Sequence, residues 1–203
     1  MLELDHLAIS AEHLDEGIAV IEAALGVALA GGGEHPLMGT HNRLLGLGDL
    51  YFEVIAINPA APPPNRPRWF DLDRFAGPPR LTNWICRCED LAAELAVSPP
   101  GTGEIVALAR GEFRWQMAIP ADGRLPFDGA FPALISWQGA LHPAPLLPES
   151  GIRLRVLEIA HPEARALHEA LAPRISEPRV VIVEGPRAMR ATFSTPHGPR
   201  VLE

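Results

Sequence analysis

Two polar residues, each set inside an apolar run, are the strongest candidates for chemistry in this chain. His6 lies in the run LDHLAI (residues 4–9), and Glu53 lies in the run YFEVI (residues 51–55). Both runs have the composition of buried strands, and regular alternation places His6 on the face shared with Leu4. Burying a carboxylate among aliphatic groups costs several kcal/mol unless a partner stabilises its charge. That partner is either a divalent cation shared with His6 or an ordinary hydrogen-bonding or arginine partner, and the sequence leaves both open.

Polar residues between these two positions extend the candidate site. His41 is a candidate for a third nitrogen ligand, because alternate residues of neighbouring strands converge on one face of a sheet. Asn42 points to the opposite face, so a strand without a bulge allows only one of the two to line a shared cleft. His35 lies in a Gly- and Pro-containing segment that we expect to be a loop, where it is either a substrate contact at the cleft mouth or a solvated histidine. The glycines at 31–33 lack the lysine and hydroxyl residue of a phosphate-binding loop and favour a flexible turn.

The middle of the chain supplies candidates for substrate binding. Trp84, Trp115 and Trp137 fall on predicted strands, and aromatic walls are typical of pockets for small organic ligands. The same side chains equally fill ordinary cores. Arg114 is either a two-point anchor for a substrate carboxylate or a surface arginine. No serine or cysteine has a motif that activates a nucleophile, so nucleophilic acyl transfer is not expected.

Periodicity predicts the elements that position these residues. Residues 3–10 form a strand, and apolar residues then recur at helical spacing from Leu14 to Leu25, where Gly26 is placed to end the helix. Residues 41–47 and 50–57 are predicted to form a hairpin that turns near Gly48 and Asp49.

This pattern of elements recurs along the chain. We expect βαβββ units at residues 1–58, 81–150 and 151–203, with a Pro-rich linker at 59–80, all within one compact domain. A shift of 77 residues places Asn83 on His6, and a shift of 150 places Glu203 on Glu53. The predicted class is α+β, with curved antiparallel sheets around a half-open barrel.

Composition limits the class of partner. The chain has 203 residues and a formal net charge of −8, which argues against nucleic acid or an anionic membrane as a partner. No uncharged apolar run approaches the roughly 18 residues that span a bilayer. The acidic N-terminus enters a strand at once, so we expect no secretory signal and a cytoplasmic location. Cys86 and Cys88 are predicted to be free core residues, because a disulfide between same-face neighbours would be strained.

The residues singled out above resemble a known group. The LDHL strand, the helix after it and the YFEV strand resemble the first module of the vicinal oxygen chelate superfamily. Its members include glyoxalase I, extradiol dioxygenases, fosfomycin-resistance enzymes and bleomycin-binding proteins. Residues 35–42, Glu53 and residues 125–137 are most similar to its "glyoxalase-like domain" group. The resemblance spans most of the chain and implies the fold more strongly than the reaction, since one fold hosts many chemistries.

The resemblance also implies a metal centre. In metal-using members, paired modules each supply one ligand from the first strand and one from the last. His6 and Glu53 match the first pair, with His41 as an optional third ligand for zinc, iron, manganese or nickel. Asn83 stands where histidine or glutamine is usual, and residues 134–136 offer no carboxylate. No pairing of modules therefore recovers four ligands.

Three functions remain open from the sequence. The leading hypothesis is a lyase, isomerase or dioxygenase whose metal polarises two adjacent substrate oxygens. Glu53 serves in it as a ligand or as a base whose pKa is raised by burial. The alternatives are a metal-free protein that sequesters an aromatic or hydrophobic small molecule, and a structural relative without a ligand. The modules pair either within one chain or across a homodimer.

Overall fold

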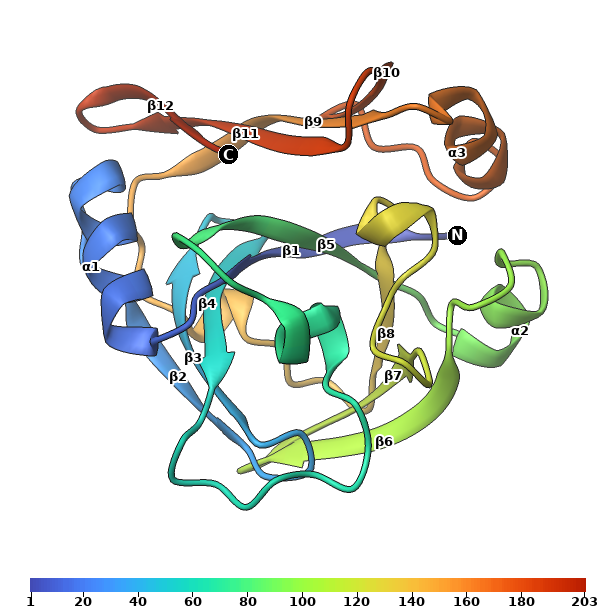
Figure 1. Cartoon of the computed structure of the whole chain (residues 1–203). Coiled ribbons are helices and arrows are strands. Elements are labelled where there is room, and N and C mark those ends of the chain that lie inside the picture. The colour runs from blue at the N-terminus through green and yellow to red at the C-terminus, as the bar shows by residue number, and fades with distance from the viewer.

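The computed structural model describes residues 1–203 and has the predicted α+β architecture (Figure 1). An eight-stranded sheet curls into a half-barrel, and a four-stranded sheet lies across its outer face. The elements in chain order are β1 (Glu3–Ser10), α1 (Leu14–Leu25), β2 (Ala30–His35), β3 (Thr40–Gly46), β4 (Tyr51–Ile57), η1 (Trp69–Arg74), β5 (Arg80–Arg87), α2 (Leu91–Ala96), β6 (Glu104–Arg110), β7 (Phe113–Ile119), η2 (Phe127–Gly129), β8 (Ala133–Trp137), η3 (Ala144–Leu146), β9 (Arg153–His161), α3 (Ala164–Leu171), β10 (Val180–Glu184), β11 (Ala188–Thr195) and β12 (Gly198–Leu202), where η marks a 3-10 helix.

The large sheet consists of two halves with the same internal order. Its strands run β2-β3-β4-β1-β5-β8-β7-β6. In each half the first strand pairs in parallel with the last, β1 with β4 and β5 with β8, and the two halves join through the antiparallel pair β1–β5. Both halves belong to one chain, so the modules of this sheet pair within the chain.

The third unit repeats the order of elements but not their pairing. In the small sheet the order is β10-β9-β11-β12, so β9 lies between β10 and β11 and does not touch the last strand. The equivalence of Glu203 with Glu53 therefore fails. Glu203 is exposed at the chain end, where its carboxylate lies 3.2 Å from the guanidinium of Arg190.

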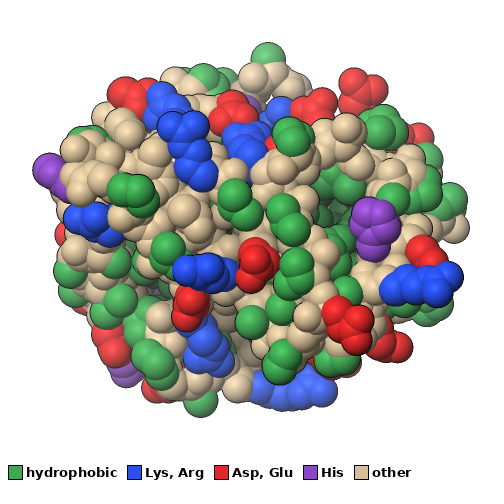
Figure 2. Space-filling view, turned by 90° about the horizontal axis from the view of Figure 1, so that it is seen from above, with side chains coloured by type: hydrophobic (Ala, Val, Ile, Leu, Met, Phe, Trp, Pro, Cys, Tyr) green, Lys and Arg blue, Asp and Glu red, His purple; other side chains and the backbone are tan.

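A continuous apolar core joins the two sheets. Phe193 of β11 meets Phe52 of β4 edge to face, with ring centroids 6.3 Å apart, and both side chains are fully buried. The outer face of the small sheet is different, because charged side chains of both signs alternate there with apolar ones (Figure 2). This one-sided burial is typical of an antiparallel sheet that packs on a core through one face.

Local structure agrees with the predicted first helix and hairpin. Gly26 ends α1 in the left-handed conformation (φ 74°), and its N–H donates to the carbonyl of Glu22. The hairpin β3–β4 turns between residues 46 and 51. Both cysteines are free and buried, as expected. No helix in the structure has the length and hydropathy that crossing a membrane requires.

Two segments differ from the prediction. The glycines at 31–33 do not form a turn but belong to the edge strand β2, where a Cβ on Gly32 would lie 2.2 Å from the carbonyl oxygen of Asn42. Glycine is thus required by a close approach of two backbones, which sequence patterns do not show. Within the segment predicted as a linker, residues 69–74 form η1. The side chains of Trp69 and Phe70 are buried on the concave side of the half-barrel.

Candidate functional site

A β-bulge in β1 aims two adjacent side chains at the hollow of the half-barrel. Leu4 pairs with Cys86 and His6 pairs with Ile85, so Asp5 is an extra residue in the strand. Leu4 therefore packs in the core between the sheets, while His6 faces the hollow. The expectation that His6 shares a face with Leu4 was wrong, because it assumed regular alternation.

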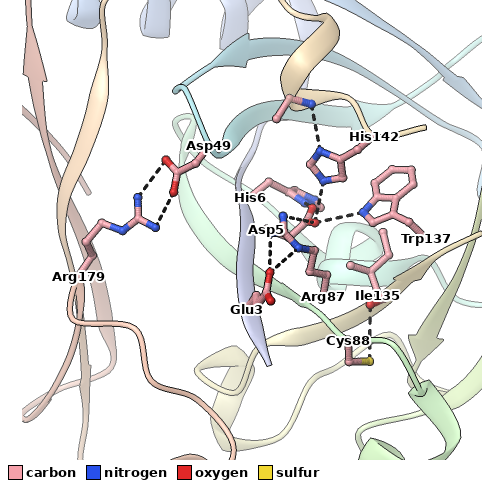
Figure 3. Close-up of polar contacts among 11 residues, drawn as sticks. Glu3, Asp5, His6, Asp49, Arg87, Cys88, Ile135, Trp137, His142 and Arg179 are labelled. Atoms are coloured by element: carbon pink, nitrogen blue, oxygen red, sulfur yellow. Dashed lines mark hydrogen bonds and ion pairs between the residues drawn. The ribbon is translucent and has the colours of Figure 1, made fainter. Parts of the chain in front are cut away.

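The carboxylate of Asp5 is the centre of a buried polar cluster (Figure 3). One oxygen lies 2.6 Å from Nδ1 of His6, and the other accepts from Nε1 of Trp137 at 3.1 Å and contacts Nε2 of His142 at 2.9 Å. The side chain of Asp5 has no exposed surface. Burial alone raises the pKa of Asp5, but hydrogen bonds with His142 and His6 outweigh it and hold the pKa well below its usual range.

His6 links Asp5 to Glu53. Its Nε2 lies 3.5 Å from Oε1 of Glu53, whose Oε2 accepts from the amide of Asn42 at 2.7 Å. Burial lowers the pKa of His6, but the two carboxylates outweigh it and raise the pKa to about 9. Burial likewise raises the pKa of Glu53, and the imidazolium and Asn42 bring it below its ordinary value. The row Asp5–His6–Glu53 therefore carries a proton on His6 between two carboxylates at neutral pH.

The pairing of β1 with β4 sets this geometry. His6 pairs with Tyr51 in the parallel ladder, and Glu53 lies two residues further along β4 on the same face. Tyr51 stacks on the imidazole, with ring centroids 4.2 Å apart and planes 16° from parallel. Burial is the main reason that the pKa of Tyr51 is well above its ordinary value, so its hydroxyl stays protonated.

A small cavity of about 30 Å³ lies beside this row. It has room for one or two water molecules and none for an organic substrate in this conformation. Its lining residues are His6, His35, Asn42, Tyr51, Glu53, Trp69, Phe70, Arg110, Trp115, Met117, Ile135 and Trp137.

Arg110, at the end of β6, brings a positive charge without a direct ion-pair partner to the cavity. Its NH1 donates to Oδ1 of Asn42 at 3.0 Å and contacts Nε2 of His35 at 3.3 Å, and no carboxylate lies within ion-pair distance. His35 is neutral at pH 7, because burial lowers its pKa to about 4. Its Nδ1 contacts the hydroxyl of Thr40 at 3.0 Å. Because Asn42 rather than a carboxylate contacts this half-buried guanidinium, an anionic group that enters the cavity finds a charged donor there.

The comparisons with known proteins agree with this geometry. A family model described as "Glyoxalase-like domain" matches residues 4–175. The chain belongs to this family. The resemblance to the glyoxalase-like group of the vicinal oxygen chelate superfamily is thereby confirmed. The match ends inside the small sheet, before β10–β12.

Two solved structures align with the glyoxalase-like domain at low identity, and the TM-score of the first indicates a shared fold. A hypothetical protein from Staphylococcus aureus has a TM-score of 0.58 and 14% identity, over 83% of this chain and 73% of its own. Methylmalonyl-CoA epimerase from Mycobacterium tuberculosis has a TM-score of 0.44 and 21% identity, over 68% of this chain and 88% of its own. No curated protein matches the sequence significantly.

Five of the side chains predicted for the site of the glyoxalase-like domain line its cavity. They are His6, His35, Glu53, Trp115 and Trp137. The loop expected around His35 is instead the end of β2, where the imidazole is only 5% exposed.

Four predicted site residues lie elsewhere. Asn42 faces the cavity. His41 is the preceding residue of the same regular strand and therefore faces away from it. Trp84 is fully buried between the sheets and donates to the carbonyl of Ala130 at 2.8 Å. Arg114 is exposed and donates to nearby backbone carbonyls. Asn83 lines a different cavity.

Several residues of the candidate site of the glyoxalase-like domain were not predicted from the sequence. Among them, Asp5 was the easiest to suspect from the sequence, because it is a charged neighbour of His6 inside an apolar run. The bulge that turns its side chain inward, however, has no recognisable sequence pattern. Trp69 and Phe70 belong to the presumed linker, and Arg110 ends a strand of the other half of the sheet. Only the three-dimensional pairing of strands brings these residues to His6.

The donor set does not fit the divalent metal implied by the family. A catalytic zinc site has three protein ligands, and non-haem iron sites use two histidines and one carboxylate. Here His6 and Glu53 are two. His35 lines the same cavity, but its Nδ1 contacts Thr40 and its Nε2 contacts the Arg110 guanidinium, which would repel a cation. The structure has no group of three or more His, Cys, Asp or Glu side chains that could hold an ion. The expected third ligand, His41, is on the other face of β3. We therefore derive no chemical step through a metal.

Proposed function

We propose that this glyoxalase-like domain is a small-molecule enzyme of the isomerase or lyase type that moves a proton at a carbon next to a carbonyl group. The observation that carries the proposal is the row Asp5–His6–Glu53, which ends at a cavity that is also lined by Arg110, a guanidinium without a direct ion-pair partner. A base, an acid and an anion-binding group thus meet at one place.

Glu53 is the proposed base. Its pKa lies below the ordinary value, so the carboxylate is ionised and free to accept a proton at neutral pH. His6 is the matching acid, since its pKa of about 9 keeps it protonated. Neighbouring groups whose environments push their pKa values apart are the usual basis for acid and base roles in one site. This replaces the expectation of a Glu53 pKa raised by burial, which overlooked the imidazolium.

Arg110 and Tyr51 are the proposed oxyanion partners. Removal of a proton next to a carbonyl places negative charge on the carbonyl oxygen, and fixed donors aimed at that oxygen lower the barrier. The Arg110 guanidinium suits the carboxylate of a small acid, and the protonated hydroxyl of Tyr51 suits the developing enolate. The chemistry therefore favours a short 2-oxo or 3-oxo acid as substrate.

Binding such a molecule requires the cavity to widen. Trp69 and Phe70 form one wall, and Phe70 holds a left-handed backbone conformation (φ 59°, ψ 22°) that bulky side chains rarely adopt. Strain of this kind is worth about 1–3 kcal/mol and its release favours a second conformation of the segment. We infer that η1 moves when substrate enters.

Hydrogen exchange measured by NMR in D2O tests the proposal. Pyruvate, 2-oxobutyrate and acetoacetate are suitable probes, and the wild-type chain should replace C–H protons next to the carbonyl faster than buffer alone. The exchange should disappear in Glu53→Gln and persist in Glu16→Gln, which alters an exposed glutamate of α1. Exchange at the wild-type rate in Glu53→Gln, or no catalysis with any probe, contradicts the proposal.

A second candidate function is supported by a separate apolar hollow of about 400 Å³ that also borders Arg110. Its apolar lining includes Phe113, Leu141 and Leu146, and Leu146 is 63% exposed. A binding protein for an aromatic or hydrophobic anion would use this hollow without turnover. Saturable binding of 8-anilinonaphthalene-1-sulfonate that is weakened in Leu146→Ser, together with no exchange of any probe, favours this function over the enzyme.

A further inference from the structure

A second, larger cavity lies on the other side of Phe70. Its volume is about 370 Å³, enough for a small organic molecule. Phe70 is the one residue that lines both this cavity and the small one at His6 and Glu53. The lining residues of the larger cavity are Phe70, Asp71, Arg74, Phe75, Arg80, Thr82, Asn83, Gly123, Arg124, Leu125, Asp128, Gly129 and Arg187.

The charge of this cavity opposes that of the whole chain. Four arginines and two aspartates line it, whereas the chain as a whole carries a formal charge of −8. Asp71 is already bound by Arg74 and Arg124. That leaves Asp128 as the one carboxylate of the lining that faces the two remaining arginines.

Those two arginines, Arg80 and Arg187, have no carboxylate partner. Arg187 donates to the carbonyl of Thr82 at 3.2 Å, and Arg80 donates to the carbonyl of Ala76 at 2.9 Å while its guanidinium lies 4.3 Å from the ring centroid of Phe75. Burial, followed by the neighbouring charge of Arg80, lowers the pKa of Arg187. Asp128 lies in the same lining and partly opposes this shift, but it forms no ion pair with either arginine. Two neighbouring guanidinium groups without a carboxylate in ion-pair distance are a suitable arrangement for an anion site.

Asn83 gives independent evidence of a missing ligand. Its side chain is 4% exposed and lines the cavity, yet its amide oxygen has no hydrogen-bond partner. Buried polar atoms are nearly always paired, because an unpaired one costs about 1–3 kcal/mol. The amide belongs to β5, so it is held by the central strand pair of the large sheet rather than by a loop.

We propose that this cavity binds the phosphate or carboxylate group of a small organic anion, held by Arg80 and Arg187, with the amide NH2 of Asn83 as a further donor. The unpartnered amide oxygen of Asn83 accepts from a hydroxyl of the same molecule or from the O–H of a monoprotonated phosphate. Arg187 comes from the turn before β11, outside residues 4–175 that match the family model. The third unit of the chain thereby completes a site on the half-barrel. The approach is close, because a Cβ on Gly129 would lie 3.0 Å from the Arg187 guanidinium.

The position of Phe70 connects the two cavities. A molecule whose anionic group is bound at Arg187 needs only the displacement of the Phe70 side chain for its other end to reach the His6–Glu53 cavity. As an anchor for the substrate, the site rests on the proposed function. Anion binding itself does not depend on that function.

Isothermal titration calorimetry of the full chain, at low ionic strength, tests the site with inorganic phosphate and with malonate as probes. The two probes distinguish a phosphate-selective from a carboxylate-selective site. We expect saturable binding of at least one of them, weakened at least about tenfold in Arg187→Gln and in Arg80→Gln. Arg200→Gln is the matched control, because this half-buried arginine of the same small sheet lies outside the cavity lining and its NH1 donates to the neighbouring carbonyl of Pro199.

Two further variants separate the possible failures. Asn83→Ala should weaken binding with an unchanged thermal midpoint, which excludes loss of folding as the cause. Glu53→Gln should bind the probe as the wild type does, because Glu53 is not part of the lining of this cavity. A wild-type chain that binds the anion but exchanges no C–H proton rejects only the catalytic proposal. No saturable heat with either probe, or wild-type affinity in folded Arg187→Gln and Arg80→Gln, overturns the anion site.

Discussion

The two halves of the large sheet have the same strand order but different chemistry. In the first half, Glu53 lies opposite the residue two positions after His6. In the second half, Ala133 lies opposite the residue two positions after Asn83. An amide and a methyl group thus occupy the positions that correspond to an imidazole and a carboxylate.

This difference shows how one fold divides a site between its repeats. The first half carries the acid and base groups, and the second half supplies the wall of Trp115, Met117, Ile135 and Trp137. The position that a metal ligand would hold in the second half, Asn83, instead faces a cavity lined by arginines. We infer that the symmetric four-ligand centre implied by the family has become a one-sided site for proton transfer.

The largest expected effect separates the two halves by activity. Glu53→Gln should lower the rate of C–H exchange by about 10²–10⁴-fold, the usual contribution of a general base. Asn83→Ala, at the corresponding position of the second half, should affect substrate affinity and leave the maximal rate nearly unchanged. Exchange kinetics at several probe concentrations measure both quantities. Equal losses of maximal rate in the two variants would mean that both halves take part in the proton transfer.

The sequence predicted elements more reliably than it predicted their pairing. The first strand, the first helix and the hairpin β3–β4 follow from apolar periodicity and turn residues, which act locally. The pairing of β9–β12 depends on which edge each strand meets in three dimensions, so the alignment of Glu203 with Glu53 was wrong. Periodicity records which side of an element is buried and not what lies against it.

Residues of the candidate site were predictable where a polar side chain interrupts an apolar strand, as at His6 and Glu53, and not where a bulge or the curl of the sheet brings them in. Glu53 was found because a charged residue stands inside an apolar strand. Asp5 was missed because the bulge in β1 reverses its direction, and Arg110 was missed because only the curling of the sheet brings the end of β6 to His35. His41 and Asn42 show this limit of sequence patterns most simply. Either of the two adjacent residues could have lined the cavity, and the structure places Asn42 there.

The bulges offer a second, smaller comparison between the halves. Asp5 is the extra residue before His6, and Thr82 is the extra residue before Asn83. Asp5→Asn should lower the free energy of unfolding by about 3–5 kcal/mol, because the buried His6 imidazolium loses half of its counter-charge. Thr82→Ala removes one hydroxyl bond to Ser10 (2.7 Å) and should cost about 1 kcal/mol.

Urea unfolding of the two variants at neutral pH measures the difference. Glu169→Gln is the control for Asp5→Asn, because Glu169 forms an exposed ion pair with Arg165 far from the Asp5 cluster and should contribute at most about 1 kcal/mol. Glu3→Gln is unsuitable, since its partner Arg87 also lies 3.7 Å from Asp5. Similar costs for Asp5→Asn and Glu169→Gln would show that His6 is not charged in the folded chain.

The protonation of His6 predicts a loss of stability in base. Its folded pKa of about 9 exceeds the ordinary value of 6.5, so the folded state binds the proton more tightly. The stabilisation is fully present below pH 6.5 and is lost as the pH rises to 9, by an amount on the order of 3 kcal/mol. The effect of His35 on stability has the opposite sign. Its folded pKa is lowered to about 4, so the unfolded state binds the proton more tightly and the folded state loses stability as the pH falls from 6.5 towards 4.

Urea unfolding across this pH range, with NMR titration of the two imidazoles, measures both effects. In Glu53→Gln the loss in base should shrink, since His6 keeps only Asp5 as a partner. A His6 that titrates near 6.5 in the folded wild type contradicts the proposed charge of the row.

The smallest expected effect concerns metal. With His6 and Glu53 as the only ionisable ligands, and Asn42 already bonded to Glu53, a divalent ion at working concentration should bind too weakly to stabilise the fold measurably. Dialysis against a chelator should therefore shift the thermal midpoint by less than about 2 °C, which corresponds to under 1 kcal/mol for a chain of this size.

Elemental analysis of the undialysed protein is the decisive companion measurement. About one equivalent of a transition ion, lost in both His6→Ala and Glu53→Gln, would show that a metal centre exists and would reject the one-sided site. A third ligand would then have to come from a rearranged second half of the sheet.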